Sequence, residues 1–407
     1  MKKLFLTICM LLSLSAFSQE ENFRPAQINF GFPLSSTNVK KAKEYTNGFS
    51  INLLVGISKN ERSLALAGIG NIIANDATGL QIASVFNHIG NNGYGIAVTG
   101  VSNTVMQSYK GIQIAGVANY SGSGVGMQIA GVTNINNGAN IGAQISGVAN
   151  INNGAAMGLQ ISGVANINNG AAMGLQISGV ANINNGAAMG LQISGVTNIN
   201  NGSFIGLQLS SVANIAGDVK GMQLSAVMNK AKKVKGVQFA TLLNIAEESN
   251  FPIAFINIIR NGKMGVALTH DILNNKVVSL RSGGKYTYGI LGFGFNNKIT
   301  EGNRLVAEAG YGIHIPITEW FEINNELKAT MTGLGSETSN NFGYFLSPSL
   351  TLLEHYNFFA GVSVNYFNSN SINSESILPN NSFWSKDGND YIHRMFVGYQ
   401  IGVQYIF

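Results

Sequence analysis

A sixteen-residue unit, GLQISGVANINNGAAM, begins at Gly158 and is repeated almost unchanged through the middle of the chain. Its glutamine and the asparagine six residues later recur in consecutive copies, at Gln128, Gln144, Gln160, Gln176, Gln192, Gln208 and at Asn134, Asn150, Asn166, Asn182, Asn198, Asn214. A short fixed period marks a repeat architecture in which each unit contacts its neighbours. The sequence therefore predicts a stack of repeats in which these amide side chains form structural ladders.

The positions within the unit differ in how much they vary. Numbered from the glycine, positions 2, 4 and 7 are apolar and position 9 is asparagine, whereas positions 8 and 10 change from copy to copy. We expect the constrained positions 2, 4, 7 and 9 to face inward. The Ser-Gly pair at positions 5 and 6 predicts a corner, and Asn168-Asn169-Gly170 predicts a turn. The resulting prediction is all-β, a parallel β-solenoid of about twelve coils of 15–16 residues, each with two short strands.

A second architecture fits the same repeat. Residues 157–167 also alternate as one continuous strand with an apolar and a mostly polar face, which would make the repeats and the C-terminal region one large antiparallel β-barrel. Two observations favour the solenoid. Barrel strands carry aromatic residues at the membrane interfaces, and none lies between Tyr120 and Phe204. Duplication of single units would also reverse every later strand of a barrel, but it leaves a solenoid undisturbed.

The N-terminus predicts export. Lys2 and Lys3 precede an apolar stretch, and small residues follow it before Gln19, so residues 1–18 are interpreted as a signal peptide. Cys9 is the only cysteine and lies within this segment, which leaves the mature chain without disulfides or cysteine chemistry. Removing the two lysines lowers the formal net charge from +5 to +3, since 5 − 2 = 3, which is too small to suggest a nucleic-acid partner.

Three further segments follow the signal peptide. Residues 19–62 are a lead-in and N-terminal cap, residues 63–248 are the tandem repeats, and residues 249–407 are a C-terminal β-barrel domain of about eight strands. In the last segment, long strands alternate between apolar and polar residues, and short turns alternate with long polar links. This pattern is typical of outer-membrane barrels. An even strand number would put both ends of the barrel on the periplasmic side.

The polar face of these strands provides the candidate barrel lining, which comprises Arg304, Glu308, Glu322, Glu326 and Lys328. Charges of both signs at these positions predict a paired lining rather than an active site. Phe383 and Trp384 in the longest loop are candidate contacts for a ligand or partner, or the loop packs on itself. The five histidines are scattered and have no metal-ligand spacing, so we expect no cofactor, no metal and no enzymatic activity.

The GLQ-x-x-x-V-x-N repeat followed by a strand-rich tail resembles the surface repeat-containing proteins of Gram-negative bacteria. The resemblance covers the chain from about residue 63 to its end and implies location and architecture, with no activity to transfer. The function expected is a non-enzymatic scaffold of the cell envelope, anchored in the outer membrane, either structural or binding. Its expected partners are outer-membrane lipid, the barrel assembly machinery and an envelope protein or glycan. The alternative is a transport pore in which the repeats are barrel strands, and the side of the membrane on which the repeats lie stays open.

Overall fold

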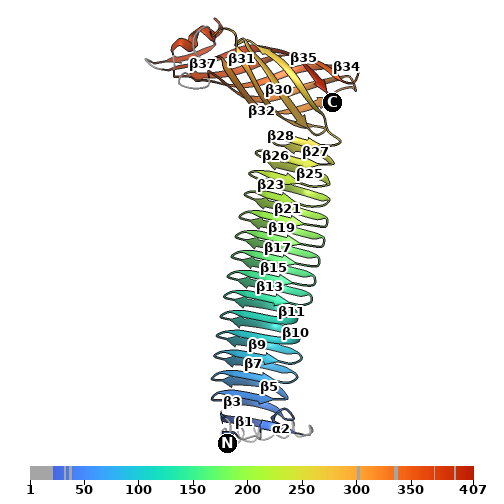
Figure 1. Cartoon of the computed structure of the whole chain (residues 1–407), viewed down its shortest axis with the longest axis vertical. Helices are drawn as coiled ribbons and strands as arrows, with labels where there is room; N and C mark the ends of the chain where they lie inside the picture. The colour runs from blue at the N-terminus through green and yellow to red at the C-terminus, as the bar shows by residue number, and fades with distance from the viewer. Residues whose placement is uncertain are drawn as a thin grey trace, which may run out of the picture. The chain divides into compact units, whose positions relative to one another are not determined.

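The computed structural model describes residues 22–31, 34–35, 39–299, 303–333, 338–370, 372–388 and 391–407, so the expected signal peptide lies outside the described residues. The chain is a parallel β-solenoid of about 13 turns followed by a closed antiparallel barrel of 8 strands (Figure 1). It divides into two compact units between Gly202 and Ser203. Among the described residues, none of the helices has the length and apolar character needed to cross a membrane.

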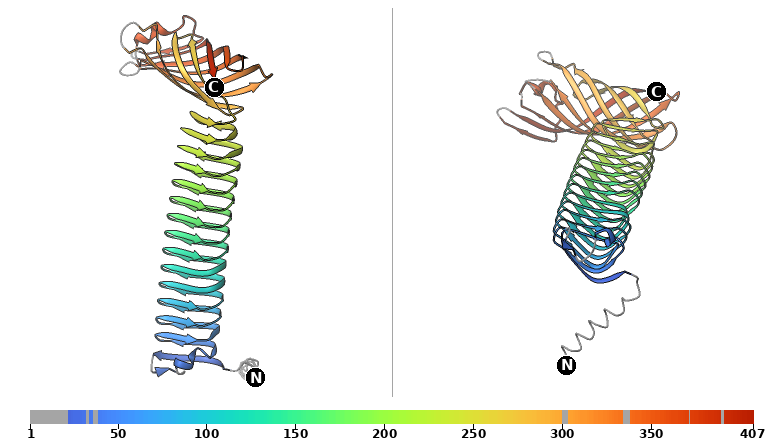
Figure 2. Two further views of the ribbon diagram at one scale, coloured as in Figure 1. Left: turned by 45° about the vertical axis from the view of Figure 1, so that its right-hand side comes forward. Right: turned by 60° about the horizontal axis from the view of Figure 1, so that its bottom comes forward.

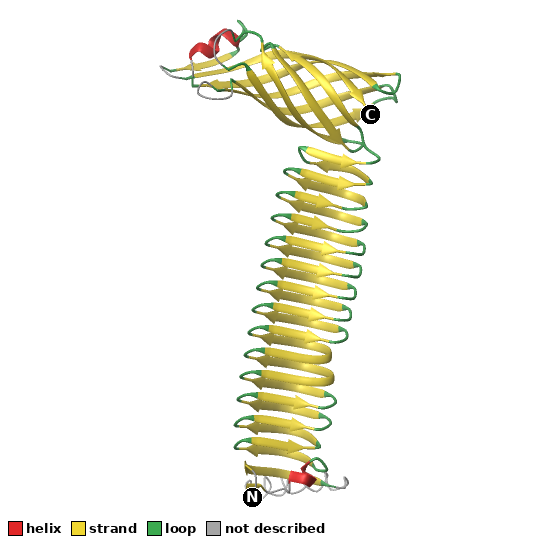
Figure 3. Ribbon diagram, viewed as in Figure 1, coloured by secondary structure: helices red, strands yellow, loops and turns green. Residues whose placement is uncertain are grey.

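The first unit consists of stacked coils (Figure 3). It opens with β1 (Phe23–Gly31), which pairs in parallel with β3 (Thr46–Asn52) and antiparallel with β2 (Leu34–Ser35). The short helix α2 (Val39–Ala42) lies between β2 and β3 in the sequence. The lead-in predicted to precede the repeats is therefore part of the stack. The remaining strands of this unit are β4 (Val55–Ser58), β5 (Asn60–Ala67), β6 (Gly70–Ile73), β7 (Ala77–Ala83), β8 (Phe86–Ile89), β9 (Gly93–Thr99), β10 (Ser102–Ala115), β11 (Ala118–Ala130), β12 (Thr133–Asn136), β13 (Asn140–Ser146), β14 (Ala149–Asn152), β15 (Ala156–Ser162), β16 (Ala165–Asn168), β17 (Ala172–Ser178), β18 (Ala181–Asn184), β19 (Ala188–Ser194) and β20 (Thr197–Asn200).

Most coils have one longer and one shorter strand, whereas β10 and β11 run on as single long strands. Equivalent strands of successive coils pair in parallel, with register shifts near Asn47 and Val105. In β15, Gln160 lies opposite Gln144 of β13 and Gln176 of β17. This pairing confirms the solenoid prediction. It also excludes the single large barrel, because neighbouring barrel strands would have to pair antiparallel.

The glycine that begins each repeat has a conformational role. Gly158 has φ +122, which side-chain-bearing residues rarely adopt, and a Cβ added there would lie 2.2 Å from the carbonyl oxygen of Gly142. The backbones of adjacent coils therefore touch at this point, and only glycine permits the contact.

The inside of the coil is polar and its outside is apolar, which reverses part of the prediction from the repeat. Gln160 and Asn166 are buried, whereas Leu159 and Ile161 lie half-buried on the outside and Val164 is exposed. Positions 2, 4 and 7 were predicted to face inward, and this was wrong. The prediction failed because the amide positions and the apolar positions of the repeat are equally constant, so constancy alone could not show which set faces inward. In β15, however, Gln160 lies on the inner face and Leu159 and Ile161 lie on the outer face, while Val164 lies in the bend before β16. The amide ladders occupy the inside of the coil.

The second unit begins with four further coils. Their strands are β21 (Phe204–Ser210), β22 (Ala213–Ile215), β23 (Val219–Ser225), β24 (Met228–Lys230), β25 (Lys233–Ala240), β26 (Leu243–Ala246), β27 (Glu248–Ile253) and β28 (Ile256–Ile259). The last pair aligns Asn244 with Asn257 in parallel. The solenoid therefore continues to Ile259, past the predicted bound at residue 248, because the last coil keeps the stacking although its sequence has diverged from the repeat.

The barrel follows in the same unit (Figure 2). Its strands are β29 (Met264–Asp271), β30 (Asn275–Gly283), β31 (Thr287–Asn296), β32 (Leu305–Pro316), β33 (Phe321–Thr332), β34 (Ser339–Leu352), β35 (Tyr356–Ser369) and β37 (Ile392–Ile406). Antiparallel pairing of β29 with β37, which aligns Gly265 with Ile406, closes the barrel. The prediction of eight antiparallel strands is thus confirmed.

The two ends of the barrel differ. One end, called here the short-turn end, carries the connections at residues 284–286, 317–320 and 353–355. The other, called the loop end, carries one short connection at residues 272–274 and the longer links, including residues 370–391 with the 3-10 helix η1 (Ile372–Ile377) and the strand β36 (Trp384–Asp387). The last coil joins the short-turn end. The amide of Tyr286 donates to the carbonyl of Asn250 at 3.1 Å, and the hydroxyl of Thr287 donates to the carbonyl of Pro252 at 2.7 Å.

Candidate functional site

The glutamine and asparagine ladders predicted from the repeat are present in both units. In the first, the Gln160 side chain donates to Gln144 Oε1 at 3.0 Å, and the Asn166 side chain donates to Asn182 Oδ1 at 2.9 Å. In the second, Gln223 donates to Gln208 at 2.8 Å, and Asn214 donates to Asn229 at 3.0 Å. Each Asn of the ladder also donates to the backbone, as Asn166 does to the carbonyl of Ile177 at 2.9 Å. Buried amides need such partners, and the stack supplies them coil by coil.

A second asparagine ladder accompanies the first. Asn168 ends strand β16 and is fully buried, and its amide donates to Asn184 Oδ1 at 2.8 Å and to Gln160 Oε1 at 2.8 Å. The sequence placed Asn168 in a turn, because Asn-Asn-Gly is a common turn sequence. Only Asn169 and Gly170 belong to the turn. The invariant first asparagine of that triplet was the signal for the second ladder.

One polar column of the interior lacks partners. Within the described residues, the hydroxyls at position 5 of the repeat are buried and form no hydrogen bond; they belong to Ser146, Ser162, Ser178, Ser194, Ser210 and Ser225. Serine is small, which allows the adjacent glutamines to fill the interior. The hydroxyl itself contributes no contact, so packing volume explains serine at this position.

The N-terminal end of the stack contains a buried carboxyl group. Glu61 is 3% exposed, and Oε1 accepts hydrogen bonds from the Asn47 amide at 2.9 Å and the Ser50 hydroxyl at 3.1 Å. Its Oε2 has no partner within the described residues. Burial disfavours the charged form and raises the pKa of Glu61 to about 7, against the opposing effect of these hydrogen bonds.

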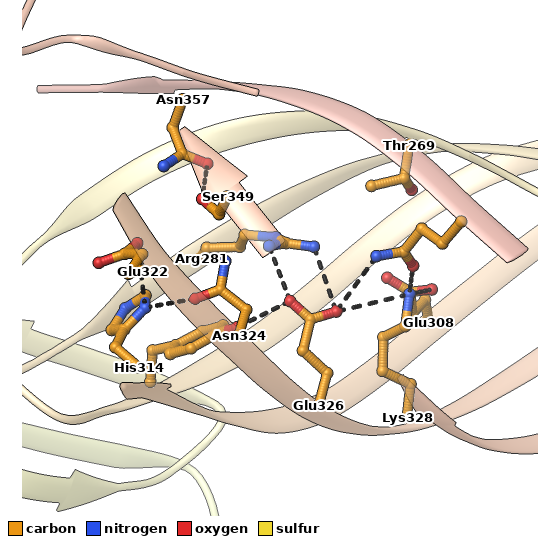
Figure 4. Close-up of polar contacts among 12 residues, drawn as sticks. Thr269, Arg281, Glu308, His314, Glu322, Asn324, Glu326, Lys328, Ser349 and Asn357 are labelled. Atoms are coloured by element: carbon orange, nitrogen blue, oxygen red, sulfur yellow. Dashed lines mark hydrogen bonds and ion pairs between the residues drawn. The ribbon is translucent and has the colours of Figure 1, made fainter. Parts of the chain in front are cut away.

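The barrel encloses a polar network (Figure 4). The Arg281 guanidinium contacts Glu326 Oε1 at 2.8 Å, and the Tyr288 hydroxyl donates to the same oxygen at 2.7 Å. Lys328 contacts Glu308 at 2.9 Å and also hydrogen-bonds Gln400. All six side chains are buried. Two cations therefore face two carboxylates, so the network is balanced in charge and fills the barrel interior.

A second group lies toward the short-turn end. Glu322 pairs with Lys263 at 2.7 Å and lies 3.4 Å from His314 Nδ1, which is 2.8 Å from Asn324 Oδ1. The His314 ring stacks on that of Tyr288 with centroids 4.1 Å apart, which links the two groups. Each charged member of this group has an oppositely charged or polar neighbour.

Four of the five residues proposed as barrel lining lie in these groups, namely Glu308, Glu322, Glu326 and Lys328. Arg304 does not line the barrel. It is exposed because strand β32 begins only at Leu305, so the inward alternation does not reach it. The interior arginine is Arg281, which sequence reasoning missed. Its signal was alternation within β30, where Ser279 and Arg281 occupy inward positions on either side of the outward-facing Leu280.

The long loop covers the loop end of the barrel through residues other than those predicted. Ile377 and Leu378 are buried against Leu273, Phe367 and Phe396. Phe383 and Trp384 are 61% and 43% exposed, and the amide of Phe383 donates to the carbonyl of Met395 at 3.0 Å. The role of Phe383 and Trp384 as a ligand or partner contact stays a prediction.

The described residues contain no cluster of three or more His, Cys, Asp or Glu side chains able to hold a metal ion. The charged groups of the two barrel networks, Arg281 with Glu326, Lys328 with Glu308 and Lys263 with Glu322, are paired with one another.

Comparison of the chain with protein-family models, with curated proteins and with solved structures finds no match in any of the three.

Proposed function

We propose that the protein is a non-enzymatic scaffold of the cell envelope, anchored by its barrel in an outer membrane, with the coils next to the barrel on the periplasmic side. The observation that carries the proposal is the polarity of the barrel wall. Along β33, Glu322, Glu326 and Lys328 are buried, whereas Leu327 between them is 64% exposed. A barrel with a charged interior and an apolar exterior matches lipid rather than water as its surroundings.

The exterior supports this assignment around the whole barrel. Every strand exposes large apolar side chains, among them Leu268 on β29, Val278 on β30, Phe293 on β31, Ile313 on β32, Phe342 on β34, Val362 on β35 and Val397 on β37. At the short-turn end, Trp320, Tyr356, Tyr405 and Phe407 are also exposed, and Tyr356 pairs with Tyr405. Aromatic side chains favour the boundary between lipid and water.

The side assigned to the coils follows from the turns. Outer-membrane barrels place short turns in the periplasm and long loops outside. The last coil joins the short-turn end through Asn250 and Pro252. The coils of the second unit therefore lie on the periplasmic side in this proposal, where a stack of coils would hold or space partners.

A transport pore is the less favoured alternative. The parallel pairing of the repeats removes the large barrel on which that alternative depended. The barrel of 8 strands has an interior filled by the Arg281–Glu326 and Lys328–Glu308 pairs. Barrels of this size enclose side chains rather than a water channel.

Membrane fractionation of cells that express the full chain tests the proposal. The mature protein is expected in the outer-membrane fraction, and its band on a gel should shift on heating, as closed barrels do when they unfold. Recovery in the soluble periplasmic fraction would reject the membrane anchor. A conductance of stable unitary steps in planar bilayers would instead favour the pore.

A further inference from the structure

The outside of the coils in the first unit carries two continuous apolar rows. The first row is formed at position 16 of the repeat by side chains that are 41–48% exposed, namely Val125, Ile141, Met157, Met173 and Met189. These residues lie opposite one another in adjacent parallel strands. The second row is formed at position 7 by side chains that are 38–42% exposed, namely Val132, Val148, Val164, Val180 and Val196.

The surface between the two rows is apolar as well. Ile161 is half-buried on the outer side of β15, and its neighbours in register are Ile145 and Ile177. We call the surface formed by positions 16, 2, 4 and 7 of these five coils the apolar face. The sequence has no charged residue from 111 to 217, so the apolar face is uncharged. It ends at Lys110, which lies opposite Val125 and takes the same place in the preceding coil.

The size of the apolar face is that of a protein–protein interface. Five coils spaced about 4.8 Å apart and seven residues of about 3.3 Å each give a surface of roughly 550 Å². Two such surfaces pressed together remove roughly 1,100 Å² from water, above the roughly 1,000 Å² that marks a specific interface. This size lies at the upper end of the range for the largest apolar patch of a typical monomer, and such patches are often functional.

The periodicity of the apolar face identifies the partner. The spacing of its rows is that of the parallel sheet itself, so another stack of the same coils presents rows at the same interval. A twofold pair of parallel stacks would also bring the position 16 row of one copy against the position 7 row of the other, setting long methionines against short valines, whereas in a pair of antiparallel stacks each row faces its own equivalent. A surface that matches itself in this way is the requirement for an isologous dimer.

We propose that the apolar face binds the apolar face of a second copy of this chain, which makes the protein a face-to-face dimer. Ile161 occupies the centre of the face and lies next to Ile161 of the second copy, whether the two stacks run parallel or antiparallel. The proposal goes beyond the scaffold function, because it concerns self-association and holds for either placement of the barrel.

Cysteine cross-linking of the full chain tests the proposal, since the mature chain contains no cysteine of its own. Ile161→Cys is expected to form a disulfide-linked dimer on mild oxidation of intact cells. Asn169→Cys, an exposed position in the turn of the same coil, is the matched control and should remain mostly monomeric. Ile193→Cys distinguishes the directions. In a parallel pair, two copies that both carry Ile193→Cys should form a disulfide with each other. In an antiparallel pair, a copy with Ile193→Cys should instead form a disulfide with a copy that carries Ile129→Cys, and either result supports the dimer.

A second variant measures the strength of the association. Ile161→Glu would bury two unpaired carboxylates in the dimer and should weaken dimerisation of the purified chain about a hundredfold or more, measured by light scattering across a dilution series. Ile161→Val should dimerise like the parent chain. A parent chain that stays monomeric at all concentrations, or an Ile161→Cys chain that cross-links no more than Asn169→Cys, would overturn the proposal. Disulfide cross-links from Ile161→Cys to another protein instead of a second copy would overturn it as well.

Discussion

At the scale of the residue, the interior of the solenoid depends on amides whose hydrogen bonds are completed by neighbouring coils. Asn166 donates to Asn182, to the carbonyl of Ile177 and to the carbonyl of Gln160. Asn166→Ala should lower the free energy of unfolding of the solenoid by roughly 2–4 kcal/mol, because groups above and below lose their partner in a dry interior. The urea midpoint of the solenoid transition, followed by circular dichroism, measures this loss.

Ser162→Ala is the control in the same coil. The Ser162 hydroxyl is buried and has no partner within the described residues. Its removal should leave the urea midpoint unchanged or raise it by an amount equivalent to about 1 kcal/mol, because an unsatisfied buried hydroxyl opposes folding. Equal losses for the serine and the asparagine variants would show that packing volume, and not the ladder, stabilises the coil.

Glu61 gives the N-terminal coil a pH dependence. The pKa of its carboxyl is raised from 4.5 to about 7 in the folded chain, so folding favours the protonated form. The resulting stability is fully present below about pH 4.5 and is lost as the pH rises to about 7, by about 3 kcal/mol in total.

Native-state hydrogen exchange of the β3 amides, corrected for intrinsic exchange rates, tests this prediction. The free energy of local opening should fall between pH 5 and pH 8 in the parent chain. Glu61→Gln should remove most of the change, because the amide stays neutral at both values. A parent chain whose β3 opening energy is the same at both pH values would contradict a neutral buried carboxyl.

At the scale of the element, the barrel strands depend on paired charges. Glu326 is fully buried and contacts Arg281, Tyr288 and Gln400. Glu326→Ala should lower the stability of the barrel by about 3–5 kcal/mol, because Arg281 is left as a buried charge without its carboxylate. The temperature at which the folded gel band converts to the unfolded band should fall accordingly.

The double variant Arg281→Met with Glu326→Leu controls for the loss of the pair as a whole. It should recover much of the stability, since apolar side chains of similar volume replace both charges. If the single and the double variants lose the same stability, the charged pair is not what holds this part of the barrel.

The two kinds of element were predictable to different degrees from the sequence. Alternation placed Glu326 inward and Leu327 outward in β33, because a strand leaves only two faces. In the coils the same reasoning failed for Leu159 and Ile161, because an invariant side chain indicates either a buried core or an exposed face that contacts another surface. The role of Arg281 was not predicted because its partners Glu326 and Tyr288 lie on other strands. The contact among the three side chains depends on the register of the barrel strands.

Removal of one repeat tests the coils as additive elements. Deletion of residues Gly158–Met173 takes out one coil and leaves its neighbours with identical partners. The loss of stability should amount to one coil and one interface. The deletion protein should still reach the outer membrane at close to the normal amount, shown by fractionation and by resistance to protease. Degradation of this protein, with tolerance of the deletion Gly158–Met189, would contradict independent coils.

At the scale of the whole molecule, the barrel and the coils have the same distribution of polarity, with polar side chains inside and apolar side chains outside. The barrel has charges inside and apolar side chains outside, which suits lipid. The coils have amides inside and apolar side chains outside, which suits a second copy of the same surface. The chain has a single cysteine, Cys9, so cysteines introduced at single positions can probe both surroundings.

Labelling with a maleimide that does not cross the outer membrane tests the central claim most directly. Ser382→Cys lies in the long loop and Asn169→Cys lies in a turn of the coils, and both positions are exposed. We predict that Ser382→Cys is labelled in intact cells, whereas Asn169→Cys is labelled only after the outer membrane has been permeabilised. Labelling of Asn169→Cys in intact cells, with Ser382→Cys protected until permeabilisation, would contradict an outer-membrane barrel whose repeats lie in the periplasm.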